Sequence, residues 1–247
     1  MLGATHDREP KLWGPYTERD PFHDPFTMFS YLAAITERIE LVTGVLILPQ
    51  RQTALAAQQA ADVDLLSAGR LRLGVGTGWN YVEYDALGQD FARRGPRLDE
   101  QIGLMRRLWS EPLVSFEGTF DKVDRANINP RPRRRIPIWV GGFSEPAFRR
   151  GGRFGDGFIF AGRIDRCVEA IGSVRGHLAA AGRSADDFGL EYIGTSLTSV
   201  DQVRENAAAW RAAGGTHLSI VTMGMGLDSI EGHVDYLGRA LEAVERS

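Results

Sequence analysis

Apolar residues recur along this chain at two spacings, and segments with one spacing alternate with segments of the other over most of its length. Short, continuous or alternating apolar runs predict β-strands, whereas apolar residues three or four positions apart predict helices with one buried face. Six runs predict strands, at residues 39–48, 71–76, 137–142, 157–161, 189–194 and 217–222. Helical spacing is found at residues 22–36, 53–67, 98–110, 145–153, 166–181 and 200–213, and in a last helix with apolar residues from 230 to 244.

A strand followed by a helix, repeated, predicts a parallel sheet covered by helices. We expect an α/β fold of the TIM type, a (β/α)8 barrel, in one domain over residues 1–247 with residues 81–135 as an insertion. Only six strands are predicted, so the barrel lacks its first two strands at the N-terminus. We expect the missing units to precede residue 1, and upstream sequence encoding no strand–helix–strand would remove that hypothesis.

The stretch from Leu71 to Asn80 begins as a strand and then loses its bulky side chains. It carries Gly74, Gly76 and Gly78 at every second position, where glycine costs chain entropy and packing. This pattern indicates a ligand lying close against the backbone, and the alternative is a tight strand-to-helix turn without a ligand. A dinucleotide fingerprint is disfavoured, because the third glycine at the required spacing and a first βαβ unit are missing.

Composition and charge narrow the classes of partner. The chain is 43% hydrophobic and 25% charged, with a net charge of −3, so no general attraction to nucleic acid is expected. Its single cysteine, Cys167, cannot form an internal disulfide, and no cluster of metal ligands is visible. No apolar run approaches the roughly 18 residues of a membrane span, and the N-terminus is unlike a secretion signal. We expect a cytoplasmic protein with a small-molecule substrate and no metal, membrane or nucleic-acid partner.

Several segments, taken in order, resemble the bacterial luciferase-like monooxygenase superfamily, and most of all its branch of coenzyme F420-dependent oxidoreductases. One of them is RLRLGVGTGWN at residues 70–80, and the likeness extends over most of residues 20–160. Each segment alone is weak, and the segments are specific when taken together and in order. The other matching segments are residues 20–26, 43–51, 84–88, 116–120, 137–142 and 154–158.

The resemblance implies a barrel that holds a flavin or deazaflavin at its open end. It implies that the ring lies against Gly44 and Val45, at a strand bulge that commonly contains a non-proline cis peptide bond. It also implies that Thr77, Gly78 and Asn80 contact the side chain and phosphate region of the cofactor.

The resemblance assigns a phosphate role to one further loop, and helix starts bind anions on general grounds. The residues of this loop are Gly141, Gly142, Phe143 and Ser144. The polar pair that the family often uses to bind the deazaflavin or relay a proton would precede Met1, so the catalytic residues stay unknown.

Other polar and aromatic residues keep two interpretations each. His6 and His23 either take part in proton transfer or are solvated loop residues. Glu83 either reaches the ring or substrate, or caps a helix or pairs with a surface residue. Trp79 stacks on a ring or packs at the rim, and Arg163 meets an acidic ligand or solvent. The basic run attracts the acidic tail of F420 or is a solvated connector, and its members are Arg131, Arg133, Arg134 and Arg135. The histidines expected to be structural or exposed are His177, His217 and His233.

Three functions follow. The first is an oxidoreductase that transfers a hydride between deazaflavin coenzyme F420 and a small organic substrate. The second is an FMN-dependent flavoprotein monooxygenase that uses O2. The third, of another class, is a non-catalytic or vestigial cofactor-binding barrel. A barrel lyase or isomerase is disfavoured, because strand ends carry neither lysine nor paired carboxylates. The resemblance and the exposed sheet edges predict a homodimer.

Overall fold

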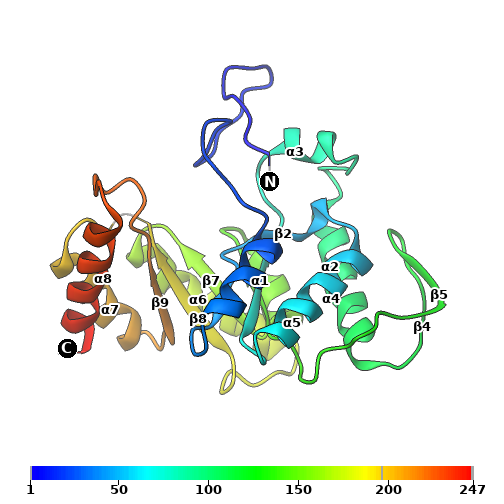
Figure 1. Ribbon diagram of the computed structural model, residues 1–247. Helices are drawn as coiled ribbons and strands as arrows, with labels where there is room; N and C mark the ends of the chain where they lie inside the picture. Colours follow the sequence, from blue (N-terminus) through cyan, green and yellow to red (C-terminus); the bar gives the residue numbers. More distant parts are fainter. Residues whose placement is uncertain (1, 196, 246–247) are drawn as a thin grey trace. The chain divides into compact units, whose positions relative to one another are not determined.

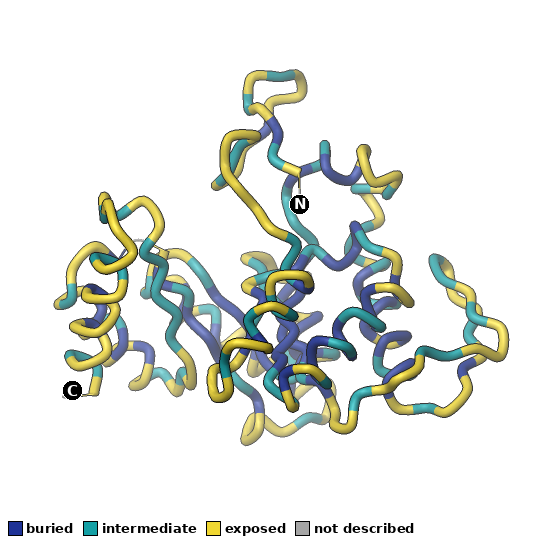
Figure 2. Tube along the Cα trace, in the orientation of Figure 1, coloured by how far each residue is buried: buried dark blue, intermediate teal, exposed yellow. Residues whose placement is uncertain are grey.

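The computed structural model describes residues 2–195 and 197–245, and the chain forms two compact units, residues 1–138 and residues 139–247 (Figure 1). In each unit parallel strands alternate with helices, as the spacing of apolar residues predicts. Figure 2 shows that the buried trace follows the strands and the helix faces packed on them. The prediction of one barrel domain over residues 1–247 stays a prediction.

Unit 1 contains the split strand, the glycine-bearing strand and the helices around them. Its elements are α1 (Pro25–Ile35), β1 (Leu41–Val42), β2 (Leu46–Ile47), the short 3-10 helix η1 (Leu48–Gln50), α2 (Thr53–Leu66), β3 (Leu71–Gly76), α3 (Tyr81–Ala86), α4 (Arg94–Ser110), β4 (Val114–Glu117) and β5 (Lys122–Ala126). The first helix begins three residues later than predicted, because the Asp24 side chain accepts from the amides of Phe26 and Thr27 and Pro25 opens the helix.

The strand predicted over residues 39–48 is interrupted. β1 and β2 both pair in parallel with β3, with Leu41 opposite Leu71 and Leu46 opposite Val75. Five residues separate the first pair from the second on this strand and four on β3, so one extra residue stands between β1 and β2. This is the β-bulge expected near Gly44, and it divides the predicted strand in two.

β3 is buried at every position, from Leu71 to Gly76. Its second residue, Arg72, is 5% exposed, and its Nε donates to the carboxylate of Glu40 at 2.9 Å. The hydroxyl of Thr43, in the bulge, donates to the carbonyl of Gly74 at 2.7 Å. The bulge therefore lies against the backbone of β3.

The segment 81–135 contains one helix that the apolar spacing did not predict. α3 has only six residues and no apolar period, and its start is set by Asn80, whose side chain accepts from the amides of Val82 and Glu83. The hairpin expected around Gly118 is present as β4 and β5, paired antiparallel. The basic connector that follows makes a structural contact, since Arg134 donates to the buried carboxylate of Asp64 at 2.6 Å.

Unit 2 repeats strand and helix with little variation. Its elements are β6 (Ile138–Gly141, which starts at the last residue of unit 1), α5 (Glu145–Phe154), β7 (Gly157–Ala161), α6 (Ile164–Ala180), β8 (Gly189–Gly194), α7 (Val200–Ala212), β9 (His217–Ile220) and α8 (Ile230–Glu245). All neighbouring strands pair in parallel, in the order β6, β7, β8, β9. β7 and β8 have the predicted bounds, whereas β9 ends two residues earlier than predicted.

The last helix buries a different face from the one its apolar period suggests. Tyr236 and Ala240 are buried, and the Tyr236 hydroxyl donates to the carbonyl of Leu197 at 2.9 Å. Four apolar side chains of the predicted stripe are exposed, with exposed fractions between 40% for Leu237 and 80% for Ile230, and Val244 is half-buried. Within the described residues, no helix has both the length and the apolar content to cross a membrane.

Candidate functional site

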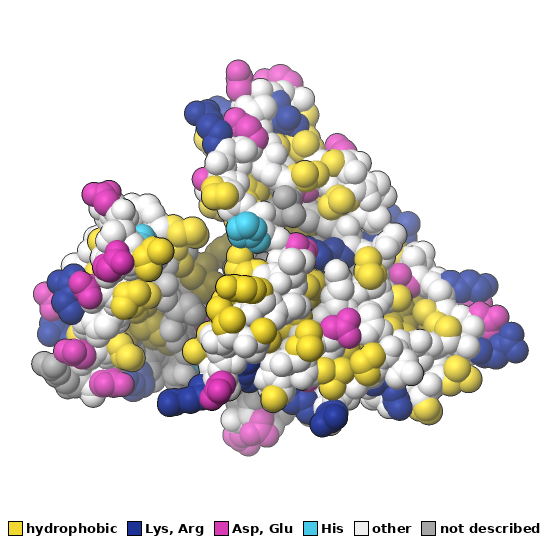
Figure 3. Space-filling model, in the orientation of Figure 1, with side chains coloured by type: hydrophobic (Ala, Val, Ile, Leu, Met, Phe, Trp, Pro, Cys, Tyr) yellow, Lys and Arg dark blue, Asp and Glu magenta, His cyan; other side chains and the backbone are white. Residues whose placement is uncertain are grey.

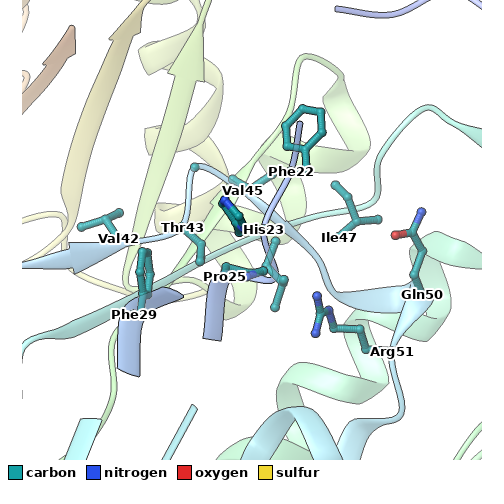
Figure 4. A pocket seen from close by; sticks show the side chains of 12 residues that line it. Phe22, His23, Pro25, Phe29, Val42, Thr43, Val45, Ile47, Gln50 and Arg51 are labelled. Atoms are coloured by element: carbon teal, nitrogen blue, oxygen red, sulfur yellow. The ribbon is translucent and has the colours of Figure 1, made fainter. Parts of the chain in front are cut away.

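Unit 1 contains a cavity of about 250 Å³ beside the bulge between β1 and β2. Figure 4 shows its lining side chains, which come from the loop before α1 and its first turns, from the split strand with its bulge, and from η1 and the residue after it. The lining residues are Phe22, His23, Pro25, Phe29, Val42, Thr43, Gly44, Val45, Leu46, Ile47, Gln50 and Arg51. Two segments that are distant in the sequence, 22–29 and 42–51, therefore build one concave surface.

Most of the cavity wall is apolar, and part of it is backbone. The peptide bond between Gly44 and Val45 is cis, as the resemblance implied, and both residues line the cavity. The Thr43 hydroxyl also lines it but is already engaged with the Gly74 carbonyl. The bulge thus presents a backbone surface flanked by side chains such as Phe29, which suits a flat, largely apolar molecule.

Polar groups gather at the end of the cavity formed by η1. Gln50 is 9% exposed, and Arg51 follows it directly. Arg51 Nη2 donates to Asp24 Oδ2 at 2.7 Å. Burial works to raise the pKa of the Asp24 carboxyl, but the bond from Arg51 and the amides of Thr27 and Phe26 outweigh it and lower the pKa. The Asp24 carboxylate is therefore ionised at neutral pH and is paired with the Arg51 guanidinium at the cavity wall.

A buried carboxylate lies behind this polar end. Glu83, on α3, is 1% exposed and accepts hydrogen bonds from the amide of Leu2 at 2.6 Å, from Gln50 Nε2 at 3.0 Å and from the Tyr16 hydroxyl at 3.3 Å. Burial, followed by the charge of Glu83, raises the pKa of Tyr16, which keeps its hydroxyl protonated as a donor. Glu83 does not line the cavity, so it reaches a ligand there only through Gln50.

Sequence reasoning missed Gln50 and Arg51. A signal for them existed, because they follow the apolar run 39–48 directly after Pro49, where a strand end delivers side chains to one edge of a sheet. No local period distinguishes them from the polar residues of an ordinary loop. Only their burial, and the partner that each has in a distant segment, marks them as part of a site.

Thr77, Gly78 and Asn80 follow β3 and are not among the residues that line the cavity. Gly78 has φ +65°, and a Cβ there would meet the side chain of Ile47 at 2.9 Å, so this glycine is needed for close packing. Thr77 accepts from the Tyr84 hydroxyl through its carbonyl at 2.6 Å. Asn80 is 1% exposed and caps α3. Their contact with a cofactor stays a prediction.

The predicted phosphate loop belongs to unit 2, between β6 and α5. Gly142 has φ +155°, and a Cβ there would meet that of Ala147 at 2.6 Å. Phe143 is 78% exposed. Ser144 precedes α5, and its side chain caps no amide of that helix. Gly141 ends β6. The phosphate role of these four residues also stays a prediction.

The structure separates the other candidates. His23 lines the cavity, whereas the ring of His6 contacts the carbonyl of Tyr16 at 3.1 Å. The Trp79 ring packs on Tyr16, with ring centroids 4.9 Å apart, which favours the packing interpretation. Arg163 pairs with Asp165 at 2.7 Å, both exposed, which favours the solvent interpretation. Within the described part of the chain, no three His, Cys, Asp or Glu residues are placed to hold a metal ion.

Comparison with known proteins gives the family. The family model described as luciferase-like monooxygenase matches residues 5–240. An F420-dependent glucose-6-phosphate dehydrogenase of Intrasporangium calvum is 38% identical over 178 residues, which are 67% of this chain and 53% of that protein. The pyrimidine monooxygenase RutA of Allorhizobium ampelinum is 32% identical over 175 residues, 67% of this chain and 47% of that protein.

The solved structures confirm the fold class. The crystal structure of monooxygenase RslO1 from Streptomyces bottropensis aligns with a TM-score of 0.75 and 21% identity, over 90% of this chain and 82% of that one. This likeness supports the predicted α/β fold of the TIM type. The chain spans about half the length of the two curated relatives described above. With a family match over residues 5–240, the chain belongs to the luciferase-like monooxygenase family.

Proposed function

We propose that this chain is an oxidoreductase that transfers a hydride between deazaflavin coenzyme F420 and a small organic substrate. The observation that carries the proposal is the cavity of unit 1, whose wall includes the backbone of the bulge at Gly44 and Val45. The identity of 38% to a protein named F420-dependent glucose-6-phosphate dehydrogenase supports the choice of coenzyme.

The residues of the cavity fit a flavin-type ring. A volume of about 250 Å³ lies just below the roughly 300–1,000 Å³ of whole small-molecule sites, so the cavity suits a ring system and not an entire coenzyme. Its wall offers apolar contacts from Val45 and Ile47 and the planar ring of Phe29. Its polar end offers the nearly buried amide of Gln50, whose oxygen has no hydrogen-bond partner among the described residues.

A bound deazaflavin supplies the hydride chemistry itself, because its ring carries the reactive carbon. The protein's residues bind, orient and shield the ring. Val45 and Ile47 exclude water from one part of the cavity, and Gln50 and Arg51 orient the polar edge of the occupant. Among the described residues that line the cavity, His23 is the one imidazole, and its ring nitrogens can donate or accept a hydrogen bond there.

A second candidate is an FMN-dependent monooxygenase using O2. It is favoured by the 32% identity to a protein named pyrimidine monooxygenase and by the structural likeness to a protein named monooxygenase. In both candidates we propose that Gly141–Ser144 meets the phosphate region, that the substrate is a small molecule, and that the protein works in the cytoplasm as a homodimer.

Separate titrations of the purified chain with coenzyme F420 and with FMN, followed by cofactor fluorescence, test the proposal. Micromolar binding of F420 with weak binding of FMN is the expected result. Preference for FMN, with oxygen uptake when the flavin is reduced, would move the function to the monooxygenase.

The same titrations address the non-catalytic alternative. Tight binding of F420 without hydride exchange with any small alcohol or aldehyde tested would indicate a binding protein. Binding of neither cofactor would contradict the proposed function for this chain.

A further inference from the structure

The side-chain amide of Gln50 is held in one orientation by a hydrogen bond to Glu83. Its Nε2 donates to Glu83 Oε2 at 3.0 Å, and the same carboxylate oxygen accepts from the Tyr16 hydroxyl. Because a carboxylate that accepts has no proton to give, the nitrogen of the Gln50 amide must face Glu83. The amide oxygen then faces the opposite way, and Figure 4 shows it on the side of the other lining side chains.

The oxygen of Gln50 is an acceptor held ready for a ligand. The residue is nine-tenths buried, yet none of the described residues donates to this oxygen. This oxygen is not among the fully buried atoms without a partner, so it is open to the cavity, where water or a ligand can donate to it. Here the atom is directed into a cavity that the rest of the wall makes suitable for a flat ring.

Arg51 adds donors beside this acceptor. Its guanidinium has five N–H groups, and the contact with Asp24 at 2.7 Å uses one of them. Figure 4 shows the heads of Gln50 and Arg51 on the same side of the cavity. The polar end of the cavity therefore presents an acceptor next to a donor.

The pyrimidine edge of a flavin or deazaflavin has the complementary order of groups, with the N3–H donor between two carbonyl acceptors. We propose that Gln50 Oε1 accepts a hydrogen bond from the N3–H of the ring and that Arg51 donates to a neighbouring ring carbonyl. This inference rests on the proposed function, and it names the residues that recognise the ring whichever of the two cofactors is used.

Glu83 acts through Gln50 as a positioning residue. Its carboxylate selects which end of the amide faces the cavity, and it is itself fixed by the amide of Leu2 and the hydroxyl of Tyr16. Replacement by glutamine would let the new amide donate to Gln50 Oε1, so that Nε2 of Gln50 could rotate toward the cavity. A donor would then face the N3–H, and recognition of that group would be lost.

The test compares rings with and without the N3–H. Wild-type protein is titrated with 8-hydroxy-5-deazariboflavin and with FMN, each beside its N3-methyl derivative, and fluorescence gives the dissociation constants. Wild type is expected to bind the unmethylated ring about tenfold more tightly than the methylated one, as befits one hydrogen bond in a mostly buried site.

Three variants separate the hydrogen bond from other causes. Gln50→Met keeps the length of the side chain and removes the acceptor. It should therefore weaken the binding of the unmethylated ring about tenfold and leave the binding of the methylated ring unchanged. Glu83→Gln should also reduce the preference for the unmethylated ring. Glu100→Gln is the matched control, because Glu100 likewise accepts three hydrogen bonds, from the amides of residues 119–121, and does not line the cavity.

The outcomes separate the two proposals. Equal binding of methylated and unmethylated rings to wild type would overturn the inference and leave the proposed function standing. Normal binding of the unmethylated ring by Gln50→Met, with its thermal midpoint unchanged, would overturn it as well. The preference of wild type would then come from the bulk of the N3-methyl group and not from a hydrogen bond to Gln50. Binding of no ring by wild type would overturn both proposals. A fall in preference for Glu100→Gln equal to that for Glu83→Gln would remove the positioning role.

Discussion

This protein has a cavity in unit 1 and a groove in unit 2, and they differ in the hydrogen bonding of their polar lining atoms as well as in volume. The groove of unit 2, between β9 and the helices α7 and α8, has a volume of about 500 Å³, twice that of the cavity in unit 1. Figure 3 shows apolar side chains exposed on the surface over α8. The groove is lined by Ala207, Trp210, Arg211, Gly215, Thr216, His217, Leu218, Ile220, Leu237, Leu241 and Val244.

Each polar side chain of the larger hollow has at least one partner within the protein. Arg211 donates to the carbonyl of Val244. The Thr216 hydroxyl donates to the carbonyl of Leu190, and His217 Nδ1 lies 2.8 Å from the Thr216 hydroxyl. In the smaller cavity, by contrast, none of the described residues donates to the side-chain oxygen of Gln50. Arg51, like Arg211, bonds one protein oxygen through its guanidinium and has further N–H groups. An unsatisfied polar atom in a small cavity is therefore better evidence of a ligand than a large apolar groove.

The largest expected effect comes from filling each hollow in turn. Val42→Trp in β1 should weaken ring binding on the order of a hundredfold, because an indole occupies much of the cavity. Leu218→Trp in β9 is the matched change in unit 2 and should leave binding unaltered. Fluorescence titration measures both, with circular dichroism as a check of folding. Equal losses in the two variants would break the comparison.

Cys167 offers a second way to sharpen the comparison, because it is the chain's one cysteine and lies in unit 2. It is 4% exposed, and burial, with a smaller part from Asp165, raises its thiol pKa to about 11 from 9.0. The thiolate fraction at neutral pH should fall on the order of a hundredfold. Maleimide should react slowly with native protein and fast in denaturant. Fast native reaction would show that unit 2 opens readily.

Arg134 tests the basic connector and the stability of unit 1. Removal of its head in Arg134→Met would leave the Asp64 carboxylate, 2% exposed, without its cationic partner. We expect a loss of about 2–4 kcal/mol in the free energy of unfolding. Arg133→Met, one residue away and exposed, should cost less than about 0.5 kcal/mol. Urea denaturation measures the difference, and similar midpoints for the two variants would contradict the structural role of the pair.

The smallest expected effect concerns Asp24, which caps α1 and holds Arg51. Asp24→Ala should cost about 1 kcal/mol, and Asp24→Asn much less, because asparagine also caps helices. The carboxyl has a lower pKa in the folded protein than in the unfolded chain. Its contribution is thus complete above the unfolded pKa, about 4, and is lost as the pH falls through the folded value. Thermal midpoints from pH 6 to pH 2 should fall less steeply for Asp24→Asn.

The strand–helix alternation could be predicted from the sequence because burial of one face leaves a local period. β7 and β8 have their predicted bounds, and the helix expected at residues 53–67 ends one residue earlier. The resemblance located the cis bond between Gly44 and Val45, since the motif around it is contiguous. α3 escaped prediction, because six residues are too few to show a period and a single cap at Asn80 determines its start.

The sequence by itself determined the fold class, the family and the place of the bulge, all of which depend on neighbours in the chain. Only the tertiary structure decided which polar groups serve the cavity. Gln50 and Glu83 are 33 residues apart, and Arg51 meets Asp24 across 27 residues. Neither pair leaves a local pattern, because the partner that orients each side chain comes from another element. The carboxylate of Glu83 then decides which atom of the Gln50 amide is left for a ligand.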